Sequence, residues 1–342
     1  MSCNFLNILT TYRKGRMDEG KDIQEYHSEP LESKFMTPFA NIPYVSNVHY
    51  ARPSDVFIPK GYFQNIAEIK NFEFFEDDTV ICGFLKTGTN WCERIVWALR
   101  NDIKLNIQHA PPVSVFGIVM GIGDFDTDNN KANDEIFSSM KRPRVIKMHL
   151  SYELLPRQFQ QKQPKMIYML RNPRDVCQSL HSHFYTLQDG FSGSLQDVVN
   201  LMTDDAGFYS GPFFKHVLGY WKRRSYENIL IIFYEEMKKD LSGHIKKIAD
   251  FLDIEISDEE VSNLAKHFSF DSMKRKAEQM IPFHAKQDGH SATVEAAHKG
   301  KTMFNKGKAG SWKALFTPDM TKQMEEWESK WLKDYDLKFI YE

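Results

Sequence analysis

Four short runs of β-branched and aromatic residues constrain the fold of this chain more than any other feature. They span residues 79–84, 144–148, 165–170 and 228–234 and are almost continuously apolar. Strands have this composition when both faces of their sheet are covered. Helical patterns lie at residues 89–100, 213–224, 236–252, 257–268 and 318–334, and a further helix opens at Asn172-Pro173. The alternation predicts an α/β fold, a single domain with a central parallel β-sheet flanked by helices on both faces.

The charge balance limits the partners of this chain. Its 342 residues include 44 Lys and Arg against 46 Asp and Glu, a net charge of -2. Such a balance gives no overall attraction to nucleic acid or to an anionic membrane, so neither is expected as a partner. Any anion must be bound by a local cluster of basic groups.

The amino-terminal region and the cysteines carry little chemistry. Residues 1–50 are polar and irregular, and we expect an amino-terminal extension there, followed by one functional domain at 51–342. The sequence contains no apolar run that suits a signal peptide or a membrane span, which predicts a cytoplasmic protein. The four cysteines, Cys3, Cys82, Cys92 and Cys177, form no C-x-x-C pair. We expect reduced thiols and no zinc site.

A glycine-containing turn joins the first apolar run to the helix at 89–100. Such a turn presents backbone N–H groups at the positive end of a helix, where an anion can bind. The spacing of Gly83 and Gly88 fits the first half of the G-x-x-x-x-G-K-(S/T) loop of nucleoside triphosphatases, but Thr89-Asn90 replaces its Lys-Ser/Thr pair. The lysine stands earlier, at Lys86. The turn can therefore hold a phosphate without a metal, and an ordinary strand-to-helix turn or a nucleotide kinase remains an alternative.

Residues 84–91, FLKTGTNW, resemble the loop Y-P-K-(S/A/T)-G-T-(T/N)-W of the cytosolic sulfotransferases. In that family the loop binds 3′-phosphoadenosine 5′-phosphosulfate (PAPS). The resemblance extends over almost the whole chain beyond residue 50 and implies a P-loop-like phosphosulfate-binding loop. Its expected cofactor-binding residues are Lys86, Thr87, Gly88, Thr89, Asn90 and Trp91.

A second matching segment contains Lys147 and His149. Residues 145–150 (VIKMHL) and 154–156 (LLP) are similar to the family's K-T-H-L-P and L-L-P, with Met148 and Ser151 as departures. A lone histidine is more often a core residue. At the carboxyl end of a buried strand, however, an imidazole can take a proton from an acceptor hydroxyl near neutral pH.

A third segment, residues 168–179, is similar to the family's Y-x-x-R-(N/D)-P-(K/R)-D-V-x-x-S. Arg171 stands at a helix start, and Ser179 follows two turns along the same helix, so both can reach one phosphate. In the family this pair holds the 3′-phosphate of PAPS. Without the resemblance, Arg171 and Arg174 would be interpreted as solvated surface charges.

The remaining segments concern the adenine and the 3′-phosphate. Residues 233–240 (FYEEMKKD) match the family segment whose tyrosine, here Tyr234, contacts the adenine. Residues 269–274 (SFDSMK) match another, in which Phe270 stacks on the adenine opposite Trp91; its serine here is Ser269. In the family's R-K-G-x-x-G-D-W the expected residues are Asn305, Lys306 and Gly307. Asn305 replaces an arginine, and an uncharged amide should bind phosphate more weakly than a guanidinium.

The resemblance implies an enzyme that transfers a sulfuryl group from PAPS by in-line displacement. We expect His149 to deprotonate the acceptor hydroxyl, Lys86 to stabilise charge on the departing 5′-phosphate, and Lys147 to contact the sulfuryl oxygens. No metal is required, because the lysines and the helix amino terminus supply positive charge. A kinase would depend on magnesium, and a non-catalytic carrier would show no turnover.

The sequence says less about the acceptor. The apolar stretch 111–120, which includes Phe116, is the expected wall of an apolar pocket, and His183 follows Ser179 by one helical turn. Small hydrophobic acceptors, such as phenols, sterols or other alcohols, are expected. Retinol dehydratase, a related insect enzyme that also has a lengthened amino-terminal region, eliminates its sulfate ester, so a dehydratase is an alternative.

One segment concerns assembly. Many family members dimerise through K-x-x-x-T-V-x-x-x-E, and the aligned residues here are Lys313, Thr317, Pro318 and Lys322. Lysines facing lysines across a two-fold axis repel, and Pro318 removes a backbone donor. We expect a monomer, or a dimer built through another surface.

Overall fold

A four-stranded parallel sheet forms the centre of the protein. The computed structural model describes residues 27–30, 34–35, 37–39, 48–52, 55–59, 72–101, 142–187, 191–205, 208, 210–275 and 309–342. The strand order is β5-β4-β6-β7, and every pairing is parallel. The strands are β4 (Thr79–Gly83), β5 (Val145–Met148), β6 (Lys165–Leu170) and β7 (Ile229–Phe233). The predicted parallel sheet is confirmed.

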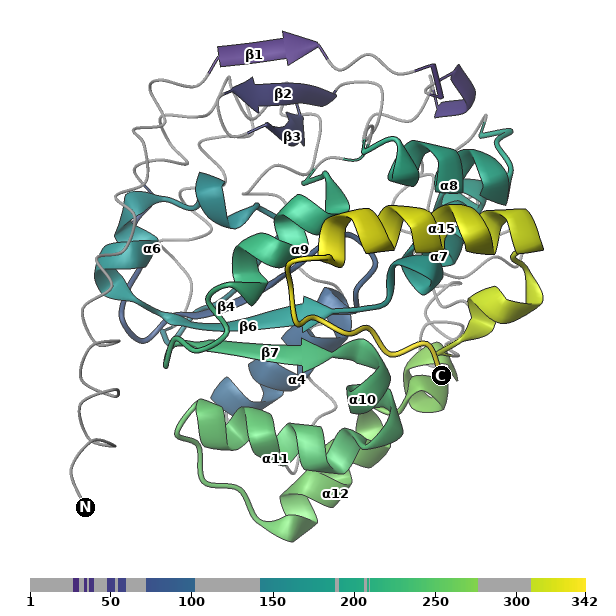
Figure 1. The fold of residues 1–342 in the computed structure, drawn as a ribbon. Coiled ribbons are helices and arrows are strands. Elements are labelled where there is room, and N and C mark those ends of the chain that lie inside the picture. Colours follow the sequence, from purple (N-terminus) through teal and green to yellow (C-terminus); the bar gives the residue numbers. More distant parts are fainter. Residues whose placement is uncertain are drawn as a thin grey trace, which may run out of the picture.

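Helices cover both faces of this sheet (Figure 1). Alternate residues of β4 enter different cores: Val80 and Cys82 pack on one face and Ile81 on the other, as the two-residue period of a strand requires. The face of Ile81 carries α4 (Thr89–Arg100), α11 (Leu241–Phe251) and α12 (Asp258–His267). The opposite face carries α7 (Pro173–Leu187), α8 (Leu195–Thr203), α9 (Phe213–Trp221) and α15 (Pro318–Leu332). The predicted arrangement of layers is therefore confirmed.

Shorter elements connect these layers. They are the α-helices α6 (Arg157–Lys162) and α10 (Tyr234–Lys239) and the 3-10 helices η3 (Thr37–Phe39), η6 (Tyr152–Leu154) and η7 (Ser311–Ala314). Cys82, Cys92 and Cys177 are free and buried. In the part of the chain that the structure describes, no helix is both long and apolar enough to cross a membrane.

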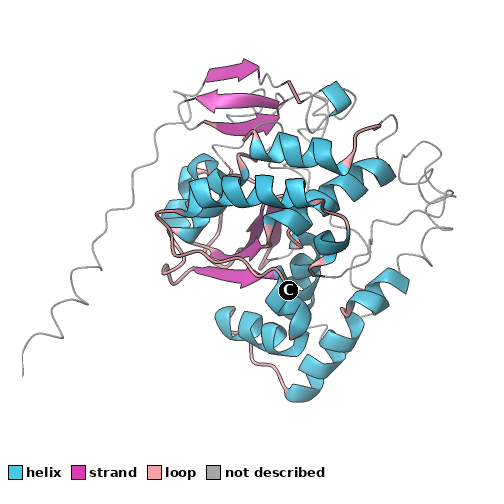
Figure 2. Ribbon diagram, turned by 45° about the vertical axis from the view of Figure 1, so that its right-hand side comes forward, coloured by secondary structure: helices cyan, strands magenta, loops and turns pink. Residues whose placement is uncertain are grey.

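The predicted irregular extension contains strands. An antiparallel sheet, β1 (His27–Pro30), β2 (Val48–Arg52) and β3 (Val56–Pro59), lies above the helices in Figures 1 and 2. Phe57 of β3 exchanges two backbone hydrogen bonds of 2.7 Å with Ser210 and Gly211. The side chain of Phe57 is also buried in the main core. Segments as short and polar as HSEP and VHYAR show no apolar period, which is why the sequence did not reveal this sheet.

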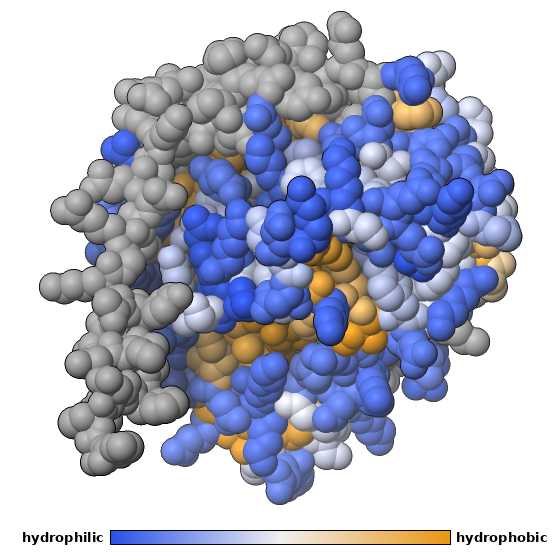
Figure 3. Space-filling view, in the orientation of Figure 1, coloured by the Kyte–Doolittle hydropathy of each residue, from blue (hydrophilic) through white to orange (hydrophobic). Residues whose placement is uncertain are grey.

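Two predicted elements differ in detail. The expected helix at 236–252 is interrupted at Asp240, whose side chain accepts a hydrogen bond from Gly243 N (2.8 Å) and caps α11. Strand β7 is an edge strand, so Leu230, Ile231 and Phe233 are only half-buried. Figure 3 shows an apolar strip where β7 lies. The apolar composition of residues 228–234 is typical of a central strand, but β7 is the last strand of the described sheet.

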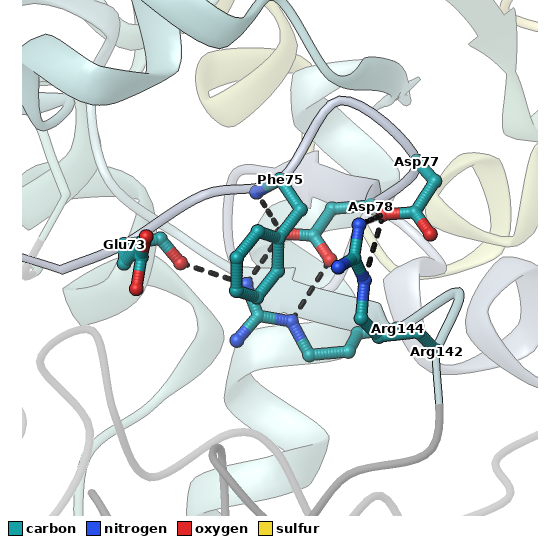
Figure 4. A network of polar contacts seen from close by, with 6 residues as sticks. All are labelled: Glu73, Phe75, Asp77, Asp78, Arg142 and Arg144. Atoms are coloured by element: carbon teal, nitrogen blue, oxygen red, sulfur yellow. Dashed lines mark hydrogen bonds and ion pairs between the residues drawn. The ribbon is translucent and has the colours of Figure 1, made fainter.

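A polar network holds the amino ends of β4 and β5 together (Figure 4). Arg144 donates to both carboxylate oxygens of Asp78, at 2.8 and 2.5 Å, and to the backbone oxygen of Glu73 at 2.7 Å. Its guanidinium lies 4.4 Å from the ring centroid of Phe75. Strand β5 is thus fixed to the residues that precede β4.

Candidate active site

The strand register brings the predicted site residues to one edge of the sheet. Cys82 pairs with Met148, Gly83 with Met169, and Leu170 with Phe233, so the four strands end close together. The next residues along the chain are the loop 84–88, His149, Arg171 and Tyr234. Ligands of open α/β sheets bind beyond the carboxyl ends of the strands.

The loop 84–88 is tightly packed. Thr87 Oγ1 donates to Phe84 O at 2.8 Å. A Cβ on Gly83 would lie 2.7 Å from Met169 O, and one on Gly88 would lie 2.7 Å from the ring of Tyr234. Gly88 also has φ 100, a conformation that favours glycine. Both glycines are thus required for the loop to lie against β6 and Tyr234.

Two cations meet at this loop, half-buried Lys86 and buried Arg171. Arg171 Nη1 donates to Lys86 O (3.1 Å), and the Arg171 guanidinium lies 4.3 Å from the centroid of the Tyr234 ring. Lys86 Nζ lies 3.4 Å from His183 Nδ1. Burial, with the nearby charges of Arg171 and Lys147, lowers the pKa of Lys86 to about 8. Neither Lys86 nor Arg171 forms an ion pair with a carboxylate among the described residues.

His149 is held as a neutral ring. Burial, followed by the charge of Lys147, lowers its pKa to about 3. Its Nδ1 lies 2.6 Å from Gly83 O, and since a carbonyl oxygen can only accept, Nδ1 carries the proton. The remaining ring nitrogen, Nε2, is then the basic one.

A second buried histidine holds the backbone of His149. His216 Nε2 lies 3.2 Å from His149 O and must donate to it. Burial lowers the pKa of His216 to about 3, so its ring is neutral and Nδ1 accepts a hydrogen bond from Tyr168 OH at 2.8 Å. The relay from Tyr168 through His216 to His149 fixes the point where β5 ends. No sequence motif pointed to it.

Lys147 contacts the first turns of α4. Its Nζ donates to Asn90 Oδ1 (2.6 Å) and lies 3.7 Å from Glu93 Oε2. Burial lowers the pKa of Lys147, and the charge of Glu93 opposes that shift. Lys147 thus ties β5 to the helix that follows the loop.

The residues expected around the adenine also lie near one another. Trp91 packs edge-on against Tyr234, with ring centroids 5.7 Å apart, and its Nε1 donates to Phe268 O (2.8 Å). That bond joins α4 to the segment with Ser269 and Phe270. Ser269 Oγ donates to Lys266 O (3.0 Å), and Lys238 Nζ lies 4.6 Å from the Phe270 ring centroid.

The interpretation of Arg171 and Arg174 as solvated charges, made without the family resemblance, is wrong. Their exposed fractions are only 7% and 6%. Arg174 forms ion pairs with Glu328 (3.2 Å) and Glu325 (3.5 Å), which compensate the charge that burial removes from water. Ser179 is half-buried and lies on α7, on the carboxyl-terminal side of Arg171 in the sequence. Thr89 is buried at the first position of α4.

Some predicted residues lie outside the described part of the chain. These are Phe116 of the acceptor pocket and Asn305, Lys306 and Gly307 of the 3′-phosphate site.

The comparisons with known proteins fit this geometry. The family model described as "Sulfotransferase domain" matches residues 76–336. The luciferin sulfotransferase of Photinus pyralis is 30% identical over 320 residues, which cover 88% of this chain and 83% of that protein. This chain belongs to the sulfotransferase family. The sulfotransferase 1B1 of Mus musculus is also 30% identical, with 80% of this chain and 89% of the relative covered.

Solved sulfotransferase structures share the fold. Retinol dehydratase in complex with retinol and PAP has a TM-score of 0.76 at 24% identity and covers 92% of this chain and 99% of its own. Mouse sulfotransferase SULT7A1 complexed with PAP has a TM-score of 0.65 at 27% identity, with 84% and 96% covered. PAP is the nucleotide that remains when PAPS has lost its sulfuryl group. The predictions of a sulfotransferase and of PAPS as donor are confirmed, and the nucleotide kinase is set aside.

The site of this sulfotransferase suits an anionic nucleotide. Arg171 Nε is buried and has no hydrogen-bond partner among the described residues. Burial, and after it the charges of Arg171 and Lys147, lowers the pKa of Lys86. An anion would supply a hydrogen-bond partner to Arg171 Nε and favour the charged form of Lys86. In the described residues, no group of three or more His, Cys, Asp or Glu side chains could hold a metal ion.

Proposed function

We propose that this sulfotransferase sulfates a hydroxyl of a small hydrophobic acceptor, with His149 as the general base. The hydrogen bond from His149 Nδ1 to Gly83 O carries the proposal, because it leaves Nε2 as the proton acceptor at the strand edge. The low pKa of His149 keeps the ring neutral across the physiological range. The same bond joins the base to the residue that begins the donor loop.

Lys86 and Lys147 supply the positive charge around the reacting group. PAPS, when bound, supplies a sulfuryl group on a phosphate leaving group. Lys86 stabilises the negative charge that grows on that phosphate as the bond to sulfur breaks in line with the attacking oxygen. Lys147 extends from β5 to contact the sulfuryl oxygens, and Asn90 and Glu93 of α4 hold its ammonium group.

The remaining predicted residues bind the nucleotide. Arg171 and Ser179, with Asn305, Lys306 and Gly307, hold the 3′-phosphate. Trp91, Tyr234 and Phe270 enclose the adenine, and Ser269, next to Phe270 in the chain, also binds the nucleotide. The loop from Lys86 to Asn90 surrounds the 5′-phosphate through its backbone N–H groups.

Calorimetry with PAP and with adenosine 5′-phosphate tests the nucleotide site. We expect PAP to bind more tightly by about tenfold or more, because a buried guanidinium then gains a charge-assisted partner. Arg171→Ala should remove this preference. Arg224→Ala, at an arginine paired with Asp336 outside the site, is the matched control and should keep it. Equal affinities of the wild-type protein for both nucleotides would contradict the assignment.

Turnover of labelled PAPS identifies the acceptor. Phe116 and His183 are the proposed acceptor-side residues, and the contact of His183 with Lys86 supports its place beside the donor lysine. A panel of phenols, sterols and retinoids covers the proposed class. Transfer to none of them in a protein that binds PAP would contradict the proposed acceptor class.

A dehydratase outcome is the second candidate. The fold shared with retinol dehydratase is the reason to test for this reaction. An assay with retinol and PAPS distinguishes the two reactions, because a sulfotransferase accumulates the sulfate ester and a dehydratase releases sulfate and an alkene. Both outcomes use the same donor site.

We also propose that residues 51–342 act as one domain. We further propose that this domain does not form the usual family dimer through residues 313–322. Thr317 Oγ1 accepts from Met320 N (3.2 Å) and Pro318 is the first residue of α15, so residues 317–320 form the start of a helix. Light scattering with crosslinking tests this. A dimer crosslinked at 313–322 would contradict it, and Lys322→Glu with Pro318→Val should favour such a dimer.

A further inference from the structure

The carboxyl-terminal tail returns to the active-site edge of the sheet. After α15 the chain turns back and runs toward the carboxyl ends of β6 and β7, where it ends (Figure 1). Leu337 is buried, and the Phe339 ring lies 6.1 Å from that of Phe213 and 6.0 Å from that of Phe214. Residues 337–342, called the tail below, are thus packed against the core.

One contact of the tail reaches the residue next to Arg171. Asn172 Nδ2 donates to Ile340 O (3.1 Å) and to Glu235 Oε1 (2.8 Å). Asn172 N also donates to Glu235 Oε1 at 3.0 Å. Asn172 is fully buried. The tail therefore helps to fix the backbone from which the Arg171 side chain extends.

A second contact encloses Arg174. Its guanidinium lies 4.3 Å from the ring centroid of Tyr341 and 4.6 Å from that of Trp312. The rings of Tyr341 and Trp312 are 6.0 Å apart and nearly perpendicular. Tyr341 also hydrogen-bonds to Glu328, the ion-pair partner of Arg174. The tail thus closes a cluster that links α7, α15 and the turn at 309–312.

That turn is bound to α7 by Asp175. The carboxylate of Asp175 accepts from Gly310 N (2.8 Å), Trp312 N (3.2 Å) and Ser311 Oγ (3.2 Å). A Cβ on Gly310 would lie 3.3 Å from Tyr341 O, so the tail lies directly against the turn. The tail therefore contacts the start of α7, beside Arg171, and the turn at 309–312.

We infer that the tail positions the 3′-phosphate side of the donor site, with Tyr341 as its main positioning residue. This rests on the proposed assignment of Arg171 to that phosphate. The tail does not contact the nucleotide. It holds the start of α7 through Asn172 and Arg174. The Arg171 guanidinium can bind a phosphate in one geometry only when the backbone that carries it is held in place.

Calorimetry on Tyr341→Ala tests the inference. We expect PAP affinity to fall by about tenfold, the scale of a desolvated cation–π contact, while affinity for adenosine 5′-phosphate changes by less than about twofold. The turnover number at saturating PAPS should stay within about threefold, because Lys86 and His149 lie outside the cluster. Lys338→Ala, at an exposed tail residue, is the matched control and should match the wild type.

A purely structural tail would give a different result. Tyr341→Ala would then lower the melting temperature and leave the preference for PAP unchanged, which would overturn the inference. Tyr341→Leu keeps the apolar volume and decides the question if the alanine variant does not fold. A wild-type protein without any preference for PAP would instead overturn the proposed donor site, and this inference with it.

Hydrogen exchange on the wild-type protein gives a second readout that needs no substitution. PAP should slow amide exchange in the tail and in residues 309–312, and adenosine 5′-phosphate should not, because only PAP carries the 3′-phosphate. Equal protection by both nucleotides, or none by PAP, would contradict the inference.

Discussion

The two ends of the parallel sheet differ in how the positively charged side chains there are paired. At the amino end, Arg144 is enclosed by the carboxylate of Asp78 and by the ring of Phe75 (Figure 4). At the carboxyl end, half-buried Lys86 lies beside buried Arg171, and neither forms a direct ion pair with a carboxylate among the described residues. The same type of group is thus paired directly at one end and not at the other.

This difference separates a structural site from a binding site. A buried ion pair offsets its loss of hydration only when both partners are present, as at Arg144 and Asp78. Burial, and after it the nearby charges of Arg171 and Lys147, lowers the pKa of Lys86, so its charge raises the free energy of the protein without its ligand. An anionic nucleotide removes that cost when it binds. The carboxyl end therefore gains more from the ligand than a paired site could.

The largest effect should come from breaking the amino-end pair. Asp78→Ala leaves Arg144 buried without its carboxylate, and we expect the free energy of unfolding to fall by about 3–5 kcal/mol. Denaturant unfolding measures this. Asp77→Ala, which removes the exposed partner of Arg142, is the matched control and should have a much smaller effect. Similar losses in both variants would contradict the structural role assigned to the buried pair.

A substitution at the carboxyl end of the sheet should lower activity rather than stability. His149→Ala should lower the turnover number by about 10²-fold or more, because it removes the proposed general base. PAP affinity should stay nearly unchanged, since His149 is proposed to act on the acceptor and not on the nucleotide. Steady-state kinetics and calorimetry on the same preparation check both. A variant with the wild-type turnover number would make His149 a core residue only.

The sequence predicted the central sheet because its strands are apolar and are separated by long helical patterns. It also predicted the donor loop, since Gly83, Lys86 and Gly88 stand between a strand and a helix in the family's order. Both signals are local in the chain. The small sheet β1–β3 has no such signal, because its strands are only four or five residues long and two of them, β1 and β2, are polar.

Long-range pairing was the second obstacle. Arg144 and Asp78 are 66 residues apart, and Arg174 and Glu328 are 154 apart. When two charged residues are so far apart in the sequence, nothing in the sequence indicates that they pair, so each is interpreted as a solvated surface residue. The relay through Tyr168 and His216 was missed for the same reason, since these residues lie on β6 and α9.

The uncompensated charge of Lys86 should make donor binding depend on pH. Its pKa of about 8 means that the free protein loses this proton as the pH rises above 8. A bound anion favours the ammonium form, so PAP affinity should fall with rising pH, by at most about tenfold per pH unit, and binding should take up protons. The phosphates of PAP are already fully ionised in this range.

Calorimetry at pH 7, 8 and 9, in buffers of different ionisation enthalpy, measures both effects. Lys86→Arg is the control, because a guanidinium stays charged and should remove the dependence. The same slope in that variant would assign the titration to Lys147, whose pKa burial also lowers.

The smallest effect should come from the relay behind the base. Tyr168→Phe removes the hydroxyl that donates to His216 Nδ1 but keeps the ring stacked on Tyr220, 4.3 Å between centroids. His216 can then adopt the other tautomer and release His149 O, and we expect the turnover number to fall by about three- to tenfold, the scale of one buried hydrogen bond. PAP affinity should not change. Tyr220→Phe, which removes a buried hydroxyl bonded to Leu150 O instead, is the matched control. If both variants lowered turnover equally, the loss would come from the packing of the strand end, and His216 would have no specific part in holding the base.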